Sequence, residues 1–137
     1  MLQALFDMQA DLNGRYGFKV RELRENFDPL EAGKWIDNQL KAMTSECEEL
    51  RDCTYWKHWC KEAQQGRRYE VRDLQNARVE VVDMLHFWIS LAQCVGLDAA
   101  EVFELYCQKN KINHQRQDGG YSMEKKDEDD NKGIGLE

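Results

Sequence analysis

The chain has few of the residues and segments that are typical of turns, secretion signals or membrane-spanning helices. It has a single proline among its 137 residues and few glycine-rich turns. Long stretches that mix charged and apolar residues fill the remainder, and this composition predicts an all-α fold. No window reaches about 18 unbroken apolar residues, which argues against a membrane-spanning helix. The N-terminal stretch MLQALFDMQADLN carries an early acid and no basic region, so we do not expect a secretory signal.

Basic residues are also in deficit, with 19 Lys and Arg against 26 Asp and Glu and a net charge of −7. A protein that binds duplex nucleic acid is normally basic, so we expect no nucleic-acid partner. A polyanionic ligand would need metal ions to bridge charges of the same sign. The charge balance therefore favours a metal-dependent site over a basic groove.

The five cysteines are an odd number, which does not suit a framework of disulfides. Three of them occupy apolar helical positions, the usual place for free thiols: Cys47, Cys94 and Cys107. Reduced thiols indicate a cytoplasmic protein. A zinc site built from Cys53, His58 and Cys60 is an alternative, but their spacing fits no familiar zinc-binding pattern.

Residues 79–95, VEVVDMLHFWISLAQCV, are apolar on nearly every face of a helix, which is typical of a bundle centre. One narrow seam is polar, and its members recur every three or four residues: Glu80, Asp83, His86, Ser90 and Gln93. Two carboxylates one turn apart in a buried helix are costly unless they are paired or bind a metal. This cost is the first indication of a functional site.

The sequence predicts a single all-α domain over residues 1–122, a bundle of four or five helices that assembles into an oligomer, and a charged, flexible tail over residues 123–137. The first helices are expected over residues 1 to about 13 and 28 to about 52, the second either whole or broken near Gly33. Two more are expected from about residue 74 to 95 and from 98 to the Gly119-Gly120 pair. Capping boxes are predicted at Asp28 with Glu31 and at Asp98 with Glu101.

Two of these helices each present a pair of acids three residues apart, Glu46 with Glu49 and Glu80 with Asp83. If the helices pack antiparallel, the four carboxylates can converge. Carboxylates without a companion histidine pair suit hard cations, so we expect two or more Mg²⁺ ions, with Mn²⁺ as a substitute. Such ions activate water for attack on phosphorus and neutralise charge on the leaving group.

The last predicted helix places Lys109, Asn113 and Arg116 on one face, and Tyr121 follows the glycine pair. These side chains are donors of the kinds that bind phosphate. Together with the acids, they predict a site for a nucleoside di- or triphosphate.

Plainer interpretations of the same residues remain open. An ExxE pair is commonly a solvated face, and Glu80 and Asp83 could form a buried salt bridge with Arg67, Arg68 or Arg78. The aromatic segment TYWKHWC could serve a non-catalytic helical interaction module. A di-iron carboxylate bundle would need Glu-x-x-His pairs on two helices, and the sequence offers no second pair.

Three segments resemble successive motifs of the dimeric dUTPases: SECEELRDCTYWKHWC, ARVEVVDMLHFWISL and YCQKNKINHQRQDGGY. That family belongs to the all-α NTP pyrophosphatase superfamily, which also contains the MazG-like enzymes. The resemblance implies Mg²⁺-dependent hydrolysis of dUTP, and also of dUDP, to dUMP. A MazG-like activity on dCTP, dATP or modified nucleotides is the alternative. It further implies a homodimer, or a tetramer, in which part of each site comes from the neighbouring subunit.

The resemblance also implies roles for individual residues. Glu46, Glu49, Glu80 and Asp83 match metal-binding acids, and Glu46 or Glu49 would orient the attacking water. The positions that match base and sugar contacts are Gln9, Asn13, Trp56, His86 and Asn110. Those that match phosphate contacts are Lys109, Asn113, Arg116 and Tyr121. The longer members carry a helical insertion before the last helix, so this chain looks like a compact form of the family.

Overall fold

The computed structural model describes residues 1–120, 122–123 and 131–137, and it is all-α over them. Its elements are α1 (Leu2–Arg15), α2 (Val20–Glu25), α3 (Pro29–Asp52), the short π-helical turn η1 (Ala63–Arg67), α4 (Leu74–Cys94) and α5 (Ala99–Asp118). The predicted all-α class is confirmed. The short helix α2 was not predicted.

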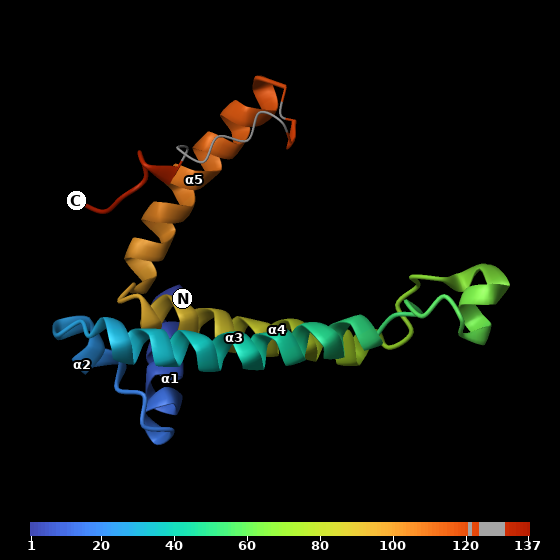
Figure 1. Ribbon diagram of the computed structural model, residues 1–137, viewed down its shortest axis with the longest axis horizontal. Helices are drawn as coiled ribbons and strands as arrows, with labels where there is room; N and C mark the ends of the chain where they lie inside the picture. The colour runs from blue at the N-terminus through green and yellow to red at the C-terminus, as the bar shows by residue number, and fades with distance from the viewer. Residues whose placement is uncertain (121, 124–130) are drawn as a thin grey trace.

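Helices α3 and α4 form a long antiparallel hairpin that runs the length of the molecule (Figure 1). Helix α3 begins where Asp28 Oδ1 accepts hydrogen bonds from the backbone N–H groups of Leu30 and Glu31, and it continues through Gly33 without a break. The Glu31 carboxylate accepts from Trp35 Nε1 at 2.9 Å, so only half of the predicted capping box at this end is present. The antiparallel pairing is the arrangement that allows acids on the two helices to converge.

An arm over residues 53–73 joins the far ends of α3 and α4 (Figure 1). Its two limbs pair through an antiparallel bridge between Thr54 and Val71, and the Tyr55 N–H donates to the Glu70 carbonyl at 3.0 Å. The Arg67 guanidinium lies over the Tyr55 ring, 5.1 Å from its centroid. Backbone pairing and cation–π contacts give this segment a defined shape.

The buried core surrounds the C-terminal half of α4. One cluster joins α1 to α4 and the start of α5, and its buried members are Phe6, Ile89, Ala92 and Ala99. A second cluster joins α2 and the start of α3 to the end of α4, and its buried members are Phe18, Leu23, Ala32 and Cys94. Because both clusters pack against the same half of α4, they fix the position of the helix that carries the polar seam.

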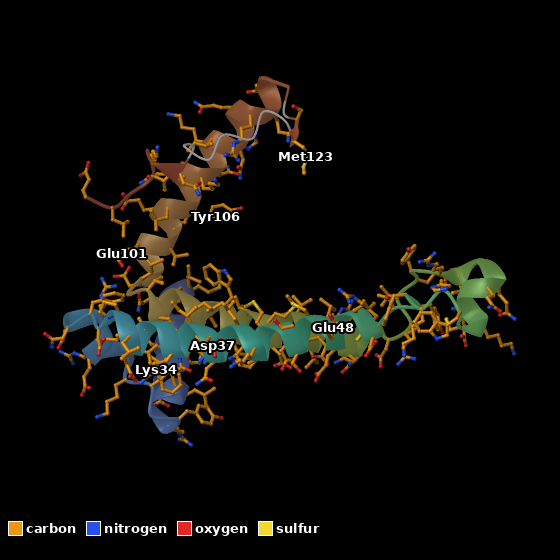
Figure 2. The ribbon with its side chains drawn as sticks, viewed as in Figure 1. Lys34, Asp37, Glu48, Glu101, Tyr106 and Met123 are labelled. Carbon is orange, nitrogen blue, oxygen red and sulfur yellow. The ribbon has the colours of Figure 1, made fainter. Side chains whose placement is uncertain are left out.

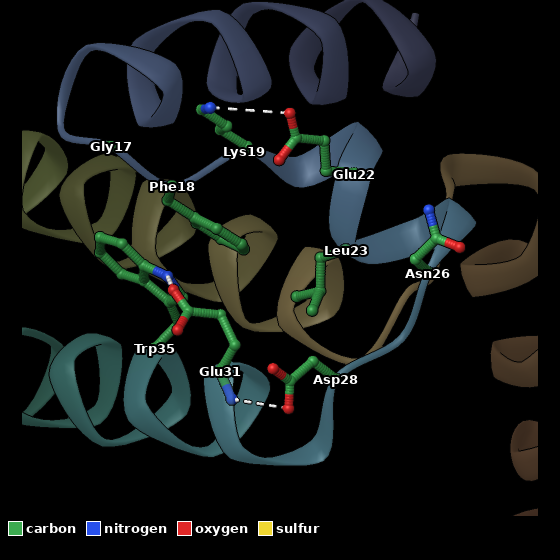
Figure 3. A pocket seen from close by; sticks show the side chains of 9 residues that line it. All are labelled: Gly17, Phe18, Lys19, Glu22, Leu23, Asn26, Asp28, Glu31 and Trp35. Atoms are coloured by element: carbon green, nitrogen blue, oxygen red, sulfur yellow. Dashed lines mark hydrogen bonds and ion pairs between the residues drawn. The ribbon is translucent and has the colours of Figure 1, made fainter.

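Helix α2 closes the open end of the hairpin beside a cavity of about 380 Å³ (Figure 3). Phe18 stacks on Trp35 with ring centroids 4.8 Å apart, and Leu23 is buried next to them. Lys19 and Glu22 pair across the rim at 3.6 Å. Six residues are too few to show a helical period, which is why the sequence pattern did not reveal α2.

Helix α5 turns 96° from α4 and projects away from the hairpin (Figure 1). The predicted capping box between Asp98 and Glu101 is confirmed, and Arg24 of α2 donates to both carboxylates. Tyr106 on α5 is 68% exposed, because α5 extends beyond the hairpin. Among the described residues no single helix is long and apolar enough to cross a membrane, and α4 and α5 meet that test only as a bent pair.

One side of α4 is not covered by the described residues. Val81, Val82, Leu85 and Trp88 lie on that side and are exposed, Trp88 by 43% of its surface. The expectation that α4 is buried on every face is therefore wrong for a single chain. A 240 Å³ apolar cavity between α1 and α4, lined in part by Val82 and Leu85, continues the same surface.

Candidate metal and nucleotide site

Three of the four predicted acids meet where α3 faces α4. Ligand oxygens of Glu46, Glu80 and Asp83 all lie within 4.8 Å of one another. Glu80 is buried, with 6% of its surface exposed, while Glu46 and Asp83 are half-buried. Spacing of this kind lets one cation bind several oxygens at once.

The cluster leaves negative charge without a protein counterpart. Glu46 Oε2 and Glu80 Oε2 are buried and have no hydrogen-bond partner among the described residues. Burial, followed by the adjoining Glu80 carboxyl group and the charges of Glu49 and Asp83, raises the pKa of Glu46. A bound cation would pair with these unsatisfied carboxylate oxygens and remove the repulsion between them. The donor set therefore fits a hard divalent ion.

Glu49 lies at the edge of this cluster. It is exposed and does not belong to the group of three, although its charge acts on Glu46. Glu49 therefore faces solvent beside the cluster.

The alternative of a buried salt bridge fails for the described residues. Neither Glu80 nor Asp83 forms an ion pair there. Arg67 pairs instead with Glu70 at 2.9 Å, and Arg68 lies over the Tyr69 ring. The zinc alternative also lacks support, because the three acids are the one metal-ligating group that the described part of the chain brings together.

A cavity of about 550 Å³ opens beside the acids. Glu46 and Asp83 line it, together with Gln9, Asn13 and His86 of the predicted base and sugar set. Phe87 and Tyr16 contribute aromatic surface to its walls. Acids that could hold a metal and amides that could read a nucleobase thus share one cavity, as a bound nucleotide requires.

The other predicted base contacts lie elsewhere in the chain. Trp56 belongs to the arm, where its Nε1 donates to Asp52 at 2.8 Å, and it does not line the cavity beside the acids. Asn110 is exposed on α5.

The predicted phosphate contacts Lys109, Asn113 and Arg116 also lie on α5, and Lys109 Nζ contacts Asn131 Oδ1 at 2.6 Å. Tyr121 lies outside the described residues. Figure 2 shows how far Tyr106 of α5 stands from Glu48 of α3.

Two residues of the site were not predicted. Asn76 donates to Glu80 Oε1 at 3.1 Å and lies one turn before it on α4. Gln39 is buried, lines the cavity, and lies seven residues before Glu46 on the same face of α3. Their helical spacing from the acids was the available signal, but polar residues at such spacing are too common to be singled out.

A family model described as dUTPase matches residues 1–101 and 88–121 of the chain. The dCTP pyrophosphatase of Enterobacteria phage T4 is 33% identical over 141 residues, which covers 88% of this chain and 82% of that protein. The dCTP pyrophosphatase of Enterobacteria phage LZ5 is 30% identical over the same shares of the two chains.

A longer protein of phage T4, named DNA replication protein, is 31% identical over 131 residues. The match covers 80% of this chain but 33% of that protein. No solved structure gave a significant match.

Proposed function

The chain belongs to the dUTPase family and is a nucleoside triphosphate pyrophosphohydrolase, and we propose from this premise that it hydrolyses dUTP, and also dUDP, to dUMP. The observation that carries the proposal is the meeting of Glu46, Glu80 and Asp83 within 4.8 Å beside a cavity lined by amides. A second substrate, dCTP, is favoured by the two phage relatives named dCTP pyrophosphatase.

We assign two or more Mg²⁺ ions to the acid cluster, with Mn²⁺ as a substitute. When bound, these ions would activate a water and neutralise charge on the phosphate chain. Glu46, Glu80 and Asp83 would hold them, and Asn76 fixes the Glu80 carboxylate by its hydrogen bond to Oε1. Glu49, on the exposed edge beside Glu46, or Glu46 itself, would orient the attacking water and accept its proton.

The nucleobase and sugar would occupy the cavity beside the acids. Gln9, Asn13 and His86 line it, and the second N–H of Gln9 and Nε2 of His86 are the groups that would contact a base edge. Phe87 supplies an apolar wall.

The remaining contacts require a second copy of the chain. We propose a homodimer, alone or within a tetramer, that covers the exposed α4 face of Val81, Val82, Leu85 and Trp88. A large exposed apolar surface of this kind is typical of subunit interfaces. In the dimer, α5 of one subunit would approach the acids of the other.

Helix α5 and the arm would then complete the neighbouring site. Lys109, Asn113, Arg116 and Tyr121 would bind the phosphates, because cationic and polar donors neutralise phosphate oxygens. Trp56 and Asn110 would contact the base or sugar from the same partner. A cytoplasmic location is consistent with a nucleotide substrate and five free thiols.

The proposal is tested by measuring phosphate and pyrophosphate release with Mg²⁺ from the common ribo- and deoxynucleoside triphosphates, dUTP and dUDP. We expect turnover of dUTP and dCTP that is lost on chelation of the metal. Preference for dATP would move the enzyme to the MazG-like branch. Absence of turnover with every nucleotide, together with no Mg²⁺-dependent change in melting temperature, would favour the non-catalytic interaction module.

A further inference from the structure

A chain of hydrogen bonds leads from a backbone carbonyl in α1 to the imidazole of His86. Gln93 Nε2 donates to the Phe6 carbonyl at 2.9 Å, and Asn13 Nδ2 donates to Gln93 Oε1 at 3.0 Å. Gln9 Nε2 then donates to Asn13 Oδ1 at 3.1 Å, and Gln9 Oε1 lies 2.7 Å from His86 Nδ1. All three amides are buried.

The direction of this chain is fixed at its start. The Phe6 carbonyl can only accept, so Gln93 must present its NH₂ group there and turn its oxygen toward Asn13. Asn13 must then present its NH₂ group to Gln93 and its oxygen to Gln9. Flipping any one amide would place two acceptors or two donors face to face, at a cost that burial increases.

Ser90 is a second residue that fixes the orientation of the Asn13 amide, and it favours the same orientation as Gln93. Its hydroxyl has two acceptors in reach, and the shorter bond goes to the His86 carbonyl at 3.0 Å rather than to Asn13 Oδ1 at 3.3 Å, so its oxygen accepts from Asn13 Nδ2 at 3.1 Å. The two N–H bonds of Asn13 are thereby used, one on Ser90 and one on Gln93. The Phe6 carbonyl, through Gln93, and the His86 carbonyl, through Ser90, thus favour the same orientation of the Asn13 amide.

This order of donors and acceptors determines which nitrogen of the neutral His86 ring carries the proton. Gln9 Oε1 is an acceptor at the end of the chain, so Nδ1 of the neutral ring must carry the proton and Nε2 must be the bare acceptor. Nε2 has no hydrogen-bond partner within the described part of the chain, and His86 lines the cavity beside the acids. The acceptor at Nε2 is therefore available to a ligand in the cavity.

We propose that Gln93 is a positioning residue that sets the tautomer of His86, so that Nε2 accepts a hydrogen bond from an N–H group of the nucleobase. The base contact rests on the proposed function, whereas the tautomer does not. Both proposed pyrimidines offer such a donor, uracil at N3 and cytosine at its exocyclic amine. Gln93 itself is buried behind Asn13 and does not line the cavity.

The tautomer is tested by ¹⁵N NMR of the histidine side chains in the free protein at about pH 8.5, where an ordinary imidazole is neutral. The three histidines are assigned with single substitutions. We expect the His86 signals to show a protonated Nδ1 and a bare Nε2, the tautomer less common in free histidine. A protonated Nε2 in the wild-type protein would overturn the proposal without any variant.

Two variants separate positioning from packing. Gln93→Met keeps the side-chain length but removes the anchor on Phe6, so His86 should shift toward the form protonated on Nε2. Ser90→Ala removes the other anchor but leaves the Phe6–Gln93 contact, so the wild-type tautomer should persist. An unchanged tautomer in a folded Gln93→Met protein would show that Gln93 only packs, and would overturn its assignment.

The base contact is tested with nucleotides whose donor is blocked. N3-methyl-dUTP against dUTP, and N4,N4-dimethyl-dCTP against dCTP, should lose about tenfold or more in kcat/KM with the wild-type enzyme. The loss should shrink in Gln93→Met, although the added methyl groups are the same. Equal discrimination in the two enzymes would reject the contact, and hydrolysis of the unmodified nucleotides would still support the proposed function.

Discussion

Asn76 holds one oxygen of the Glu80 carboxylate, and the other oxygen has no partner in the part of the chain that the structure describes. Its Nδ2 lies 3.1 Å from Glu80 Oε1 and 3.3 Å from Cys53 Sγ, so the amide is itself held by the end of α3. Glu80 Oε2 faces the other acids unsatisfied. The carboxylate is thus oriented before any ion arrives, at a cost in stability that an ion would offset.

Removing this charge should separate activity from stability. Glu80→Gln keeps the hydrogen-bonding shape but not the buried charge, so hydrolysis should fall by about 100-fold or more while the metal-free protein melts at the same or a higher temperature. Activity and differential scanning fluorimetry with EDTA or Mg²⁺ measure both effects. Glu48→Gln, on the solvent side of α3, is the matched control and should behave as wild type. Wild-type activity in Glu80→Gln would contradict the metal assignment.

The raised pKa of Glu46 gives the stability a dependence on pH. An acid whose pKa is higher in the folded protein binds its proton more tightly there, so metal-free stability should fall as pH rises from the ordinary carboxyl range through the raised pKa. A bound cation replaces the proton, so the stabilisation by Mg²⁺ should grow over the same range. Melting curves from about pH 4.5 to pH 8, with EDTA or Mg²⁺, measure this trend.

Glu46→Gln should flatten the dependence of metal-free stability on pH, because the titrating group is gone. Glu48→Gln should retain it. A stabilisation by Mg²⁺ that is equal at both ends of the range would mean that no proton is displaced from the cluster.

A site shared between subunits predicts that two inactive variants rescue each other. Glu80→Gln damages the acids and Lys109→Met damages the phosphate contacts, yet in a mixed dimer one site would receive both intact parts. Equal mixing after denaturation and refolding should recover about a quarter of wild-type activity. If the mixture stays as inactive as its components, either Lys109 and the acids of one site belong to the same subunit, or Lys109 lies outside the site. Lys111→Met, on an exposed position of α5, is the control and should remain active alone.

The link between α2 and the base of α5 should weaken in acid. Arg24 lies 2.8 Å from Glu101, and its hydrogen bonds lower the pKa of that carboxyl group. A lowered pKa means that the stabilisation is present at neutral pH and is lost as pH falls from the ordinary carboxyl range through the lowered value. Glu101→Gln should cost about 1 kcal/mol in urea unfolding at pH 7, since the pair is partly exposed, and almost nothing near about pH 3. Glu104→Gln should change neither value.

Helical periodicity accounted for much of the fold and for the centre of the site. The i and i+3 spacing of Glu80 and Asp83 on an apolar helix placed both in the cluster, and the antiparallel hairpin brought Glu46 to them. Glu49 has the same spacing from Glu46 yet lies at the exposed edge, because the angle at which α3 packs decides which acids of a pair reach the neighbouring helix.

Other features depend on long-range packing that no local pattern records. The resemblance grouped Trp56 and Lys109 with the cavity residues. Within one chain, however, the arm that carries Trp56 and the helix α5 that carries Lys109 extend away from the cavity. An apolar face such as that of Trp88 looks the same in sequence whether the chain itself or a second copy covers it. Sequence periodicity identifies which residues share a face but not which molecule faces them.

The contacts between Asn13 and α4 span long stretches of the chain. Asn13 bonds to Ser90 and Gln93 across separations of 77 and 80 residues, whereas α3 and α4 are joined by the arm alone. Closing a long loop costs more chain entropy than closing a short one, and contacts of high sequence separation form late. During folding, the hairpin that carries the acids should therefore assemble before the pocket for the base. A partly folded chain would already gather its carboxylates while still unable to tell one nucleotide from another.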